Sequence, residues 1–324
     1  MRAIRVTKFG GPEVLQSAEV ADPRPAAGQV LIRVAVTGVL GIDTVIRAGN
    51  GGDIFPLTPP YIPGAGVAGT VISAGSPVPE SLLGKRVVAS VDSGGCAELA
   101  VALVDDVHEI PDGVGFLDAM AVLHDGRTAV AVLEEVGVSP GETVLISPAA
   151  GGLGSTLVQL AAGRGATVIA LARGHGKSAV LQDLGASVVI DQSNTHWPQQ
   201  VRTAVGNDSP VDVAFDGIGG ITSNDVVGLV RSGGRYSSYG FAGGAGPASP
   251  DPNHIYDNHI QYRGLDQLAR FATRHQELGR RVLQYVADGT IRPLIGSILP
   301  LTEAAGAHDA LHRHITLGKT LLLT

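Results

Sequence analysis

The stretch that decides the fold is SPAAGGLGSTLVQLAA at residues 147–162, which directly follows the apolar run GETVLI at residues 141–146. The apolar run predicts a buried strand over 143–146, the glycines predict a turn over 148–152, and the spacing of the later apolar residues predicts a helix. In a βαβ unit of this kind, the free N–H groups and the positive dipole end of the helix point at the pyrophosphate of a dinucleotide. The stretch therefore predicts a dinucleotide-binding unit.

The glycines of this turn have separate tasks. Gly151 stands where the backbone approaches a phosphate closely, and Gly154 stands where helix and strand pack tightly, whereas Ala149 replaces the glycine with which the usual fingerprint begins. A lone GGxG is equally typical of an ordinary strand–helix turn, but the strands on both sides favour a cofactor site. We expect the turn to contact the cofactor through Ala150, Gly151, Gly152 and Leu153.

The second strand of the unit indicates which cofactor is bound. NAD sites carry Asp or Glu about 20 residues after the glycines, where it binds the ribose 2′-hydroxyl. Here that segment reads TVIALARGHGKS (167–178), with Arg173 and Lys177 and no carboxylate. Two cations at this place suit a 2′-phosphate, although a solvated basic loop would show the same pattern. The sequence therefore favours NADPH.

The rest of the chain divides into two kinds of sequence. Its first third is rich in glycine-bounded, alternating segments such as QVLIRVAVTGV (29–39), which predict a small antiparallel domain. From about residue 123, short apolar runs alternate with helix-like segments, which predicts a parallel sheet covered on both faces. A long amphipathic helix is expected over 270–289, and the tail GKTLLLT (318–324) is expected to be a strand that returns to the first domain.

Bulk composition narrows the class of protein. The 324 residues are enough for about two domains, and the net charge of −7 provides no basic face for a nucleic acid. Cys96 is the only cysteine, which excludes an intramolecular disulfide and multi-cysteine metal sites. The start MRAIRVTKFGG lacks the apolar core of a signal peptide, and no segment predicts a membrane span. We expect a soluble, cytoplasmic protein with neither a nucleic-acid nor a membrane partner.

Motifs along the whole chain resemble the medium-chain dehydrogenase/reductase superfamily, and most of all its zinc-independent quinone oxidoreductase (zeta-crystallin-like) branch. The motifs that carry the resemblance, in family order, are KFGGPEVL (8–15), GIDTVIRAG (41–49), IPGAGVAGTV (62–71), GKRVVA (84–89), CAELAV (96–101), IPDGVGFLDAMAV (110–122), GRTAVAVL (126–133), the stretch at 139–154, and GKTLLLT.

The resemblance implies an α/β fold in which a GroES-like, β-rich catalytic domain carries an inserted Rossmann domain with a doubly wound parallel sheet. It places the catalytic domain at 1–123, the cofactor domain at 124–264 and the return of the catalytic domain at 265–324. It also implies a homodimer and a small-molecule hydride acceptor.

The same resemblance bears on zinc. The zinc-dependent branch has a cysteine in the region that reads TGVLGID (37–43) here, and a His–Glu pair in the PG motif. This chain has Leu40 and Gly41 in the first region and Ala65 and Gly66 in the second, none of which supplies a thiolate or imidazole ligand. We therefore expect no metal.

A second histidine pattern, HDALHRH (308–314), places His308 and His312 on one helical face. Helical zinc sites of the HExxH type need Glu after the first His, and Asp309 stands there instead. The family has an ordinary helix at this place, so we expect no metal site here either.

Without a Lewis acid, hydride transfer to an electron-poor double bond is easier than alcohol oxidation. We expect an NADPH-dependent reductase of a quinone or an α,β-unsaturated carbonyl, with an enoyl reductase of a biosynthetic pathway as the alternative. A redox sensor or a crystallin-like structural protein is the non-enzyme alternative. Leu40 and Val45 replace the branch's usual Asn and Tyr, so we expect an apolar substrate wall of Leu40, Ile42 and Val45; Gln192 likewise replaces a Tyr of the NADPH branch.

Further cofactor contacts are expected where strands end. FDGIGG (215–220) and SYGFAGG (238–244) follow the fourth and fifth strands, whose carboxyl ends are where ligands bind in such sheets. Thr128 matches the family threonine that faces the nicotinamide, although a helix-interior Thr bonded to its own backbone is the alternative. The residues expected at the cofactor are Thr128, Gly217, Ile218, Tyr239, Gly240, Phe241 and Lys319.

Three side chains are candidates for catalysis. His124 could supply the proton that follows hydride transfer, or could be a structural histidine between the domains. Asp43 could orient a substrate or cap a helix, and Tyr61 could line the substrate entrance or pack its proline-rich loop.

Overall fold

The computed structural model describes residues 1–52, 55–206, 210–244 and 246–324. Its contacts divide the chain into two compact units. The first comprises Met1–His124, His275–Gly289 and Pro293–Thr324, and the second comprises Asp125–Arg274 and Thr290–Arg292. Each unit has its own sheet and buried core.

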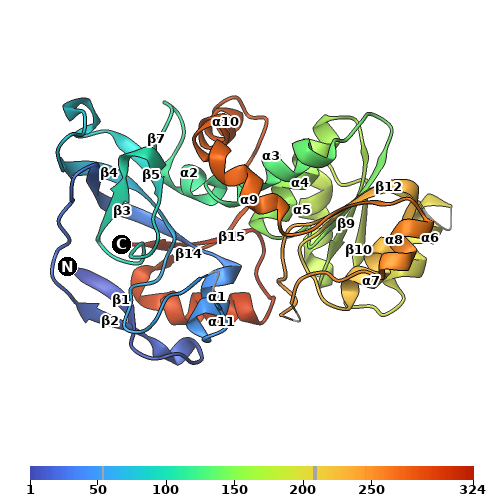
Figure 1. Cartoon of the computed structure of the whole chain (residues 1–324), viewed down its shortest axis with the longest axis horizontal. Coiled ribbons are helices and arrows are strands. Elements are labelled where there is room, and N and C mark those ends of the chain that lie inside the picture. Colours follow the sequence, from blue (N-terminus) through green and yellow to red (C-terminus); the bar gives the residue numbers. More distant parts are fainter. Residues whose placement is uncertain (53–54, 207–209, 245) are drawn as a thin grey trace. The chain divides into compact units, whose positions relative to one another are not determined.

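The second unit is a parallel sheet with helices packed against it (Figure 1). Its strands, within the described residues, stand in the order β10 (Val188–Asp191), β9 (Thr167–Ala172), β8 (Thr143–Ser147), β11 (Val211–Asp216), β12 (Val230–Ser238) and β13 (Gln261–Arg263). The helices are α3 (Asp125–Val136), α4 (Gly152–Gly163), α5 (Ser178–Asp183), α6 (Trp197–Val205), α7 (Thr222–Val227), α8 (Pro252–Asp257) and α9 (Gln267–Phe271). The strand order reverses between β8 and β11, the switch point where ligands of open α/β sheets bind.

The central strands of this sheet show why their sequences are continuously apolar. Every residue of β9 after Thr167 is buried, and β11 is buried except for Asp212. α4 packs against β8 and β9, and α7 packs against β11 and β12. Strands covered in this way leave few positions for polar side chains.

The first unit contains a mixed, mostly antiparallel sheet. In its described residues the order is β14 (Ile295–Pro300), β15 (Lys319–Leu323), β3 (Gln29–Val39), β4 (Gly66–Ala74), β5 (Arg86–Ser90) and β7 (Val107–Glu109), with β6 (Leu99–Leu103) also paired to β3. A hairpin-like pair, β1 (Arg2–Val6) and β2 (Leu15–Glu19), and the helices α1 (Gly41–Arg47), α2 (Phe116–Val122), α10 (His275–Ala287) and α11 (Ala304–His312) accompany it.

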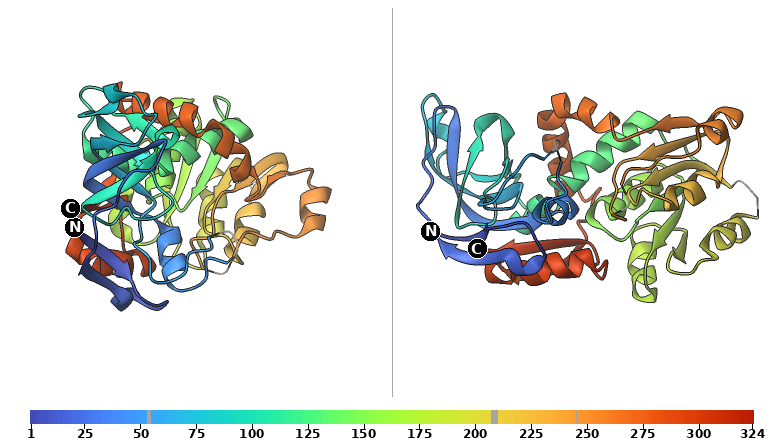
Figure 2. Two further views of the ribbon diagram at one scale, coloured as in Figure 1. Left: turned by 60° about the vertical axis from the view of Figure 1, so that its left-hand side comes forward. Right: turned by 60° about the horizontal axis from the view of Figure 1, so that its bottom comes forward.

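The tail of the chain is part of this same sheet. β15 pairs antiparallel with β3, with Thr320 opposite Val39, although these two residues are 281 positions apart in the chain. Both views in Figure 2 accordingly show the two termini close together in the first unit. The β-rich unit and the Rossmann-type sheet confirm the predicted fold class, and no helix in the described residues is long and apolar enough to cross a membrane.

The segment expected as one helix over 270–289 is broken. α9 ends at Phe271, a 3-10 turn covers Ala272–Arg274, and α10 begins at His275, where the contacts also divide the units. Arg270 and Arg274 pair with Glu135 and Glu134 of α3 at 3.3 and 3.1 Å, which ties this segment to the second unit. The structure therefore places residues 265–274 with the second unit, and not with the C-terminal return of the catalytic domain in which they were expected.

Candidate functional site

The turn between β8 and α4 has the shape of a phosphate cradle. Gly151 is the N-cap of α4 in an extended conformation, and a β-carbon built on it would meet nothing within 4 Å. A β-carbon on Gly154 would fall 2.0 Å from the carbonyl oxygen of Pro148. The open space at Gly151 suits an anion at the helix N-terminus, and the tight packing at Gly154 holds the helix close to the strand.

Asp125, which is not among the site residues predicted from the sequence, lies at the same helix end. It begins α3, and its Oδ2 lies 2.1 Å from the position that a β-carbon on Gly152 would take. The missing side chain of Gly152 therefore makes room for a carboxylate at the N-terminus of α4. A negative charge at that end of a helix is stabilised by the helix dipole.

The loop after β9 carries Arg173 and Lys177, the two cations predicted to bind the 2′-phosphate of NADPH. Arg173 is exposed, and its guanidinium has no ion-pair or hydrogen-bond partner in the part of the chain that the structure describes. Burial lowers the pKa of Lys177, and the nearby Asp191 carboxylate acts in the opposite direction. Asp191 also accepts a hydrogen bond from the Gly174 N–H at 3.1 Å, so a carboxylate from β10 holds this loop.

Gln192 links the ends of three strands. Its backbone N–H donates to Ala172 at the end of β9, and its Oε1 accepts from the Ser147 hydroxyl at the end of β8 at 3.1 Å. Its Nε2 is buried and has no hydrogen-bond partner among the described residues.

The loops after β11 and β12 are hydrogen-bonded to each other and to the end of β8. The Gly217 N–H donates to the Ser147 carbonyl at 2.6 Å, and the Ala242 and Gly243 N–H groups donate to Gly217 and Ile218. These loops contain all five residues predicted to line the cofactor after the two strands, including Gly240 and Phe241.

Tyr239, one of those five, is held beneath the loops. It is buried, its hydroxyl donates to the Ser147 carbonyl at 3.3 Å, and a β-carbon on Gly217 would lie 2.4 Å from its ring. Burial, and then the charge of Asp216, raises the pKa of this hydroxyl well above its usual value. Tyr239 therefore supports the loops from below.

In the first unit, His124 takes the space that a side chain at residue 66 would need. A β-carbon on Gly66 would fall 2.7 Å from His124 Nε2 and 2.8 Å from Met120 Cε. His124 Nε2 lies 3.0 Å from the Ala65 carbonyl oxygen, which can only accept, so this nitrogen carries a hydrogen. Met120 also approaches Gly38, as does Lys319, whose Cε lies 3.2 Å from a β-carbon built there.

The apolar wall predicted around Leu40 lies on α1. Leu40 is the N-cap of this helix, and Leu40, Ile42 and Val45 are all partly exposed. Asp43 accepts a hydrogen bond from the Leu40 N–H at 2.8 Å and so caps the helix, one of the two roles expected for it. Burial raises the pKa of Asp43 to about 6, whereas its hydrogen bond to Leu40 and the charge of Lys319 act to lower it.

This buried carboxyl predicts a pH-dependent stability. Its pKa lies above the ordinary value of 3.8, so the folded state keeps a proton that the unfolded state releases. The contribution of Asp43 to stability therefore falls as pH rises from about 4 to 6 and stays low above that range. Asp43→Asn keeps the acceptor for the Leu40 N–H. The variant should have a larger free energy of unfolding than the wild type, and this difference should grow with pH to about 2–3 kcal/mol at pH 8.

Denaturant unfolding at pH 5 and pH 8 measures this difference. Asp112→Asn, at an exposed residue, is the matched control for the loss of a surface carboxylate. A gain for Asp43→Asn that is equal at both pH values would contradict the prediction.

Tyr61 and Thr128 are the candidates whose hydroxyl groups have no hydrogen-bond partner among the described residues. The Tyr61 hydroxyl is buried without a partner among the described residues, and burial, followed by the charge of Asp43, raises its pKa to about 12. Tyr61 also lines a pocket of about 600 Å³ with Arg5, Glu19 and Ser93. Thr128 is partly exposed on α3, and its hydroxyl bonds to no described residue, so the backbone-bonded alternative is not observed.

Comparison with known proteins shows the family of this chain. The alcohol dehydrogenase GroES-like domain matches residues 26–131, and the zinc-binding dehydrogenase domain matches residues 152–278. Quinone oxidoreductase of Sus scrofa is 35% identical over 328 residues, which cover 100% of this chain and 98% of the relative. The chain belongs to the quinone oxidoreductase branch of the medium-chain dehydrogenase/reductase superfamily.

Solved structures of this superfamily agree with the assignment. A mycobacterial protein in complex with NADPH is 31% identical and superposes with a TM-score of 0.88 over the full length of both chains. The quinone oxidoreductase of Escherichia coli in complex with NADPH is 26% identical and superposes with a TM-score of 0.91, again over both full lengths.

One of the two matching domains is named a zinc-binding dehydrogenase domain, but the residues of this chain do not fit a catalytic zinc ion. The described residues contain no group of three or more His, Cys, Asp or Glu side chains that could hold a metal. Gly66 has no space for a ligand because His124 occupies it, and burial raises the pKa of the Cys96 thiol. His308 lies buried beside Arg47, and this burial lowers its pKa to about 3, while His312 is exposed.

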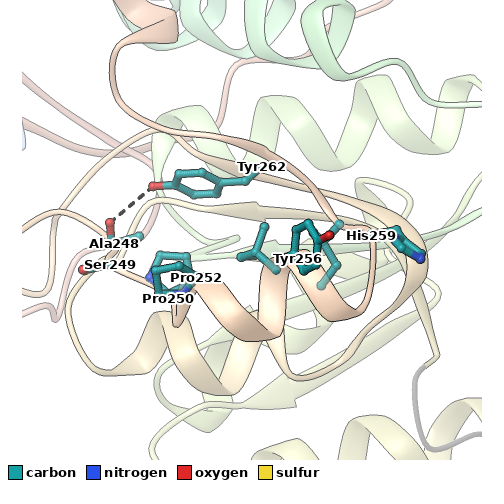
Figure 3. A pocket seen from close by; sticks show the side chains of 9 residues that line it. Ala248, Ser249, Pro250, Pro252, Tyr256, His259 and Tyr262 are labelled. Atoms are coloured by element: carbon teal, nitrogen blue, oxygen red, sulfur yellow. Dashed lines mark hydrogen bonds between the residues drawn. The ribbon is translucent and has the colours of Figure 1, made fainter.

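A separate pocket lies in the second unit, beside α8 and the edge strand β13, and has a volume of about 600 Å³. Figure 3 shows the side chains that line it. Its walls are mainly Pro250, Pro252, Ile255, Tyr256 and Tyr262, and the Tyr262 hydroxyl donates to the Ala248 carbonyl at 3.3 Å. These apolar walls offer no acid, base or anion-binding group beyond His259. The loops at the ends of β8, β9, β11 and β12 are the candidate site.

Proposed function

We propose that this chain is an NADPH-dependent reductase that transfers hydride to a quinone or an α,β-unsaturated carbonyl without zinc. The observation that carries the proposal is the open glycine at the N-terminus of α4 together with the exposed, unpaired guanidinium of Arg173. The first suits a pyrophosphate, and the second suits the extra phosphate that distinguishes NADPH from NADH. The NADPH complexes of the mycobacterial and E. coli relatives support the same choice.

The second unit would hold the cofactor. Ala150, Gly151, Gly152 and Leu153 form the turn proposed for the pyrophosphate, and Arg173 and Lys177 are proposed for the 2′-phosphate. The loops containing Gly217, Ile218, Gly240 and Phe241, with Thr128, are proposed for the nicotinamide portion. Lys319, which belongs to the first unit, stays a proposed cofactor contact outside the second unit. When bound, the cofactor supplies the hydride, and the protein supplies position and electrostatics.

The first unit would hold the acceptor. Leu40, Ile42 and Val45 present partly exposed apolar surface, which suits a flat, weakly polar ring or chain. Reduction of a quinone takes one hydride, which carries two electrons, and one proton. His124 and Asp43 are the proposed proton-holding groups, with Tyr61 near the charge of Asp43.

The apolar wall also supports a second acceptor class. Leu40 and Val45 stand where quinone oxidoreductases commonly carry Asn and Tyr, so a long apolar enoyl chain would meet fewer unpaired polar groups here. An enoyl reductase is therefore the alternative within the enzymes.

A panel of acceptors tests the proposal. Oxidation of NADPH is followed at 340 nm with para-quinones, α,β-unsaturated ketones and enoyl thioesters. We expect turnover with a quinone or a ketone and slower turnover with thioesters; faster turnover with thioesters would select the alternative. Tight NADPH binding with no turnover of any acceptor would overturn the proposal in favour of a cofactor-binding sensor or structural protein.

The position of Asp125 leads to a separate prediction about cofactor affinity. Its carboxylate at the N-terminus of α4 would repel an incoming pyrophosphate while it stabilises the empty helix end. Asp125→Asn should therefore tighten both NADPH and NADH by about three- to tenfold, because the repulsion at such a helix end is worth about 1 kcal/mol.

The same variant should lower the melting temperature of the cofactor-free protein by a few degrees. Fluorescence titration and thermal melts provide the two readouts, and Asp118→Asn, in the first turn of α2, is the control. Weaker binding by Asp125→Asn would contradict this role and would indicate that the carboxylate helps to hold the cofactor.

A further inference from the structure

Asp216, the last residue of β11, is a buried carboxylate that the proposed reaction has not used. It is 0% exposed. Its Oδ1 accepts from the N–H groups of Ile218 and Gly219 at 2.8 and 3.4 Å, and its Oδ2 accepts from the hydroxyls of Ser223 and Tyr236 at 2.7 and 2.6 Å. Among the described residues no cation lies within ion-pair distance of it.

The four partners can all donate hydrogen bonds, which suits an ionised carboxylate. Two of them are backbone N–H groups, which can only donate, and an ionised carboxylate can accept four hydrogen bonds at once. Burial, and then the charge and hydrogen bond of Asp216, raises the pKa of the Tyr236 hydroxyl far above its usual value, so the tyrosine stays a neutral donor. The carboxylate is thus satisfied by dipoles alone, and its negative charge has no salt-bridge partner.

The position of this charge follows from the topology. Asp216 ends β11 directly before Gly217, at the edge of the sheet where β8 and β11 separate. Its acceptor bonds fix Ile218 and Gly219, and Gly217 in turn bonds to Ser147 at the end of β8. The charge therefore lies at the base of the loop proposed to line the nicotinamide.

We propose that Asp216 is a positioning residue that also shifts the bound cofactor toward its oxidised form. This inference rests on the proposed function, because it requires the nicotinamide to lie over the 217–220 loop. A nicotinamide ring is neutral in its reduced form and gains a positive charge when it gives up hydride. A fixed negative charge inside a low-dielectric site stabilises the charged form more than the neutral one, which makes the bound reduced cofactor a stronger hydride donor.

Asp216→Asn separates the charge from the hydrogen bonds. The amide oxygen can still accept from Ile218 and Gly219, and the amide N–H groups can donate to the oxygens of Ser223 and Tyr236. We expect the Kd of NADP⁺ to rise roughly tenfold and that of NADPH to stay within about twofold, measured by calorimetry without any acceptor. Binding of 2′,5′-ADP, which lacks the nicotinamide, should not change.

Two control variants keep the charge and remove one donor each. Ser223→Ala and Tyr236→Phe should affect NADP⁺ and NADPH to the same extent, so their affinity ratio stays that of the wild type. Asp216→Thr is a second neutral variant, whose hydroxyl can still accept from Ile218, in case the asparagine variant fails to fold.

An unchanged NADP⁺-to-NADPH affinity ratio in the neutral variants would overturn the inference, whether both affinities fall together or neither changes. Failure of the proposed function would look different. In that case the wild-type protein itself would bind neither NADPH nor NADP⁺.

Discussion

Replacement of Gly154 by valine should abolish dinucleotide binding. A β-carbon at this position would fall 2.0 Å from the Pro148 carbonyl oxygen and 2.8 Å from the Ala149 Cα, and both are backbone atoms that cannot rotate away. The first turn of α4 would have to move off the end of β8, which would displace the cradle at Gly151. We expect the Kd of NADPH to rise more than about a hundredfold. The displaced turn would no longer hold the pyrophosphate, and at least about 3 kcal/mol of binding free energy would be lost.

Gly163, at the other end of α4, provides the control for this experiment. A β-carbon there would meet nothing within 4 Å, so Gly163→Ala should bind NADPH normally and should be slightly more stable. Circular dichroism checks that Gly154→Val remains folded, and Gly154→Ala is the milder variant. Wild-type affinity in a folded Gly154→Val protein would exclude this turn as the pyrophosphate site.

Joint replacement of Arg173 and Lys177 by alanine should remove the preference of the site for NADPH over NADH. Charge-assisted bonds to a phosphate are worth about 1.5–3 kcal/mol each, so NADPH affinity should fall roughly a hundredfold. NADH has no 2′-phosphate, and its affinity should change by less than about threefold.

The single variants Arg173→Ala and Lys177→Ala show how much of the loss in NADPH affinity is due to each residue. Arg173 has no described partner, so its loss should leave the loop intact, whereas Lys177 is half-buried near Asp191 and its loss should also lower stability. Lys85→Ala, an exposed lysine of the first unit that pairs with Glu109, is the control for a general charge effect. Equal losses for NADPH and NADH would show that these cations do not select the cofactor.

Local sequence was sufficient to predict the elements that carry the glycine turn. The continuous apolar run over 143–146, the glycines after it and the helical spacing of Leu157 and Val158 are each decided within a few residues, and β8 and α4 follow them closely. β3 likewise has the bounds of its sequence pattern, because burial on one face leaves a clear alternation of apolar and polar residues.

Tertiary contacts decided what the sequence could not show. The amphipathic pattern over 270–289 continues through Arg274, but salt bridges from Arg270 and Arg274 to α3 hold its first part on the second unit. Asp125 reaches Gly152 only because α3 packs beside α4, and Asp191 reaches the Arg173 loop only because β10 lies beside β9. Tyr239 packs against Gly217 because that residue has no side chain, and a contact between the ends of two different strands leaves no sign in the local sequence.

The most direct test of the central claim is the rate of NADPH oxidation by a para-quinone in protein that has been dialysed against a metal chelator. We expect kcat/KM for NADPH to be unchanged by the chelator and to exceed that for NADH by at least about tenfold, as the 2′-phosphate contacts require. Loss of activity that added zinc restores, or equal rates with NADPH and NADH, would contradict the account.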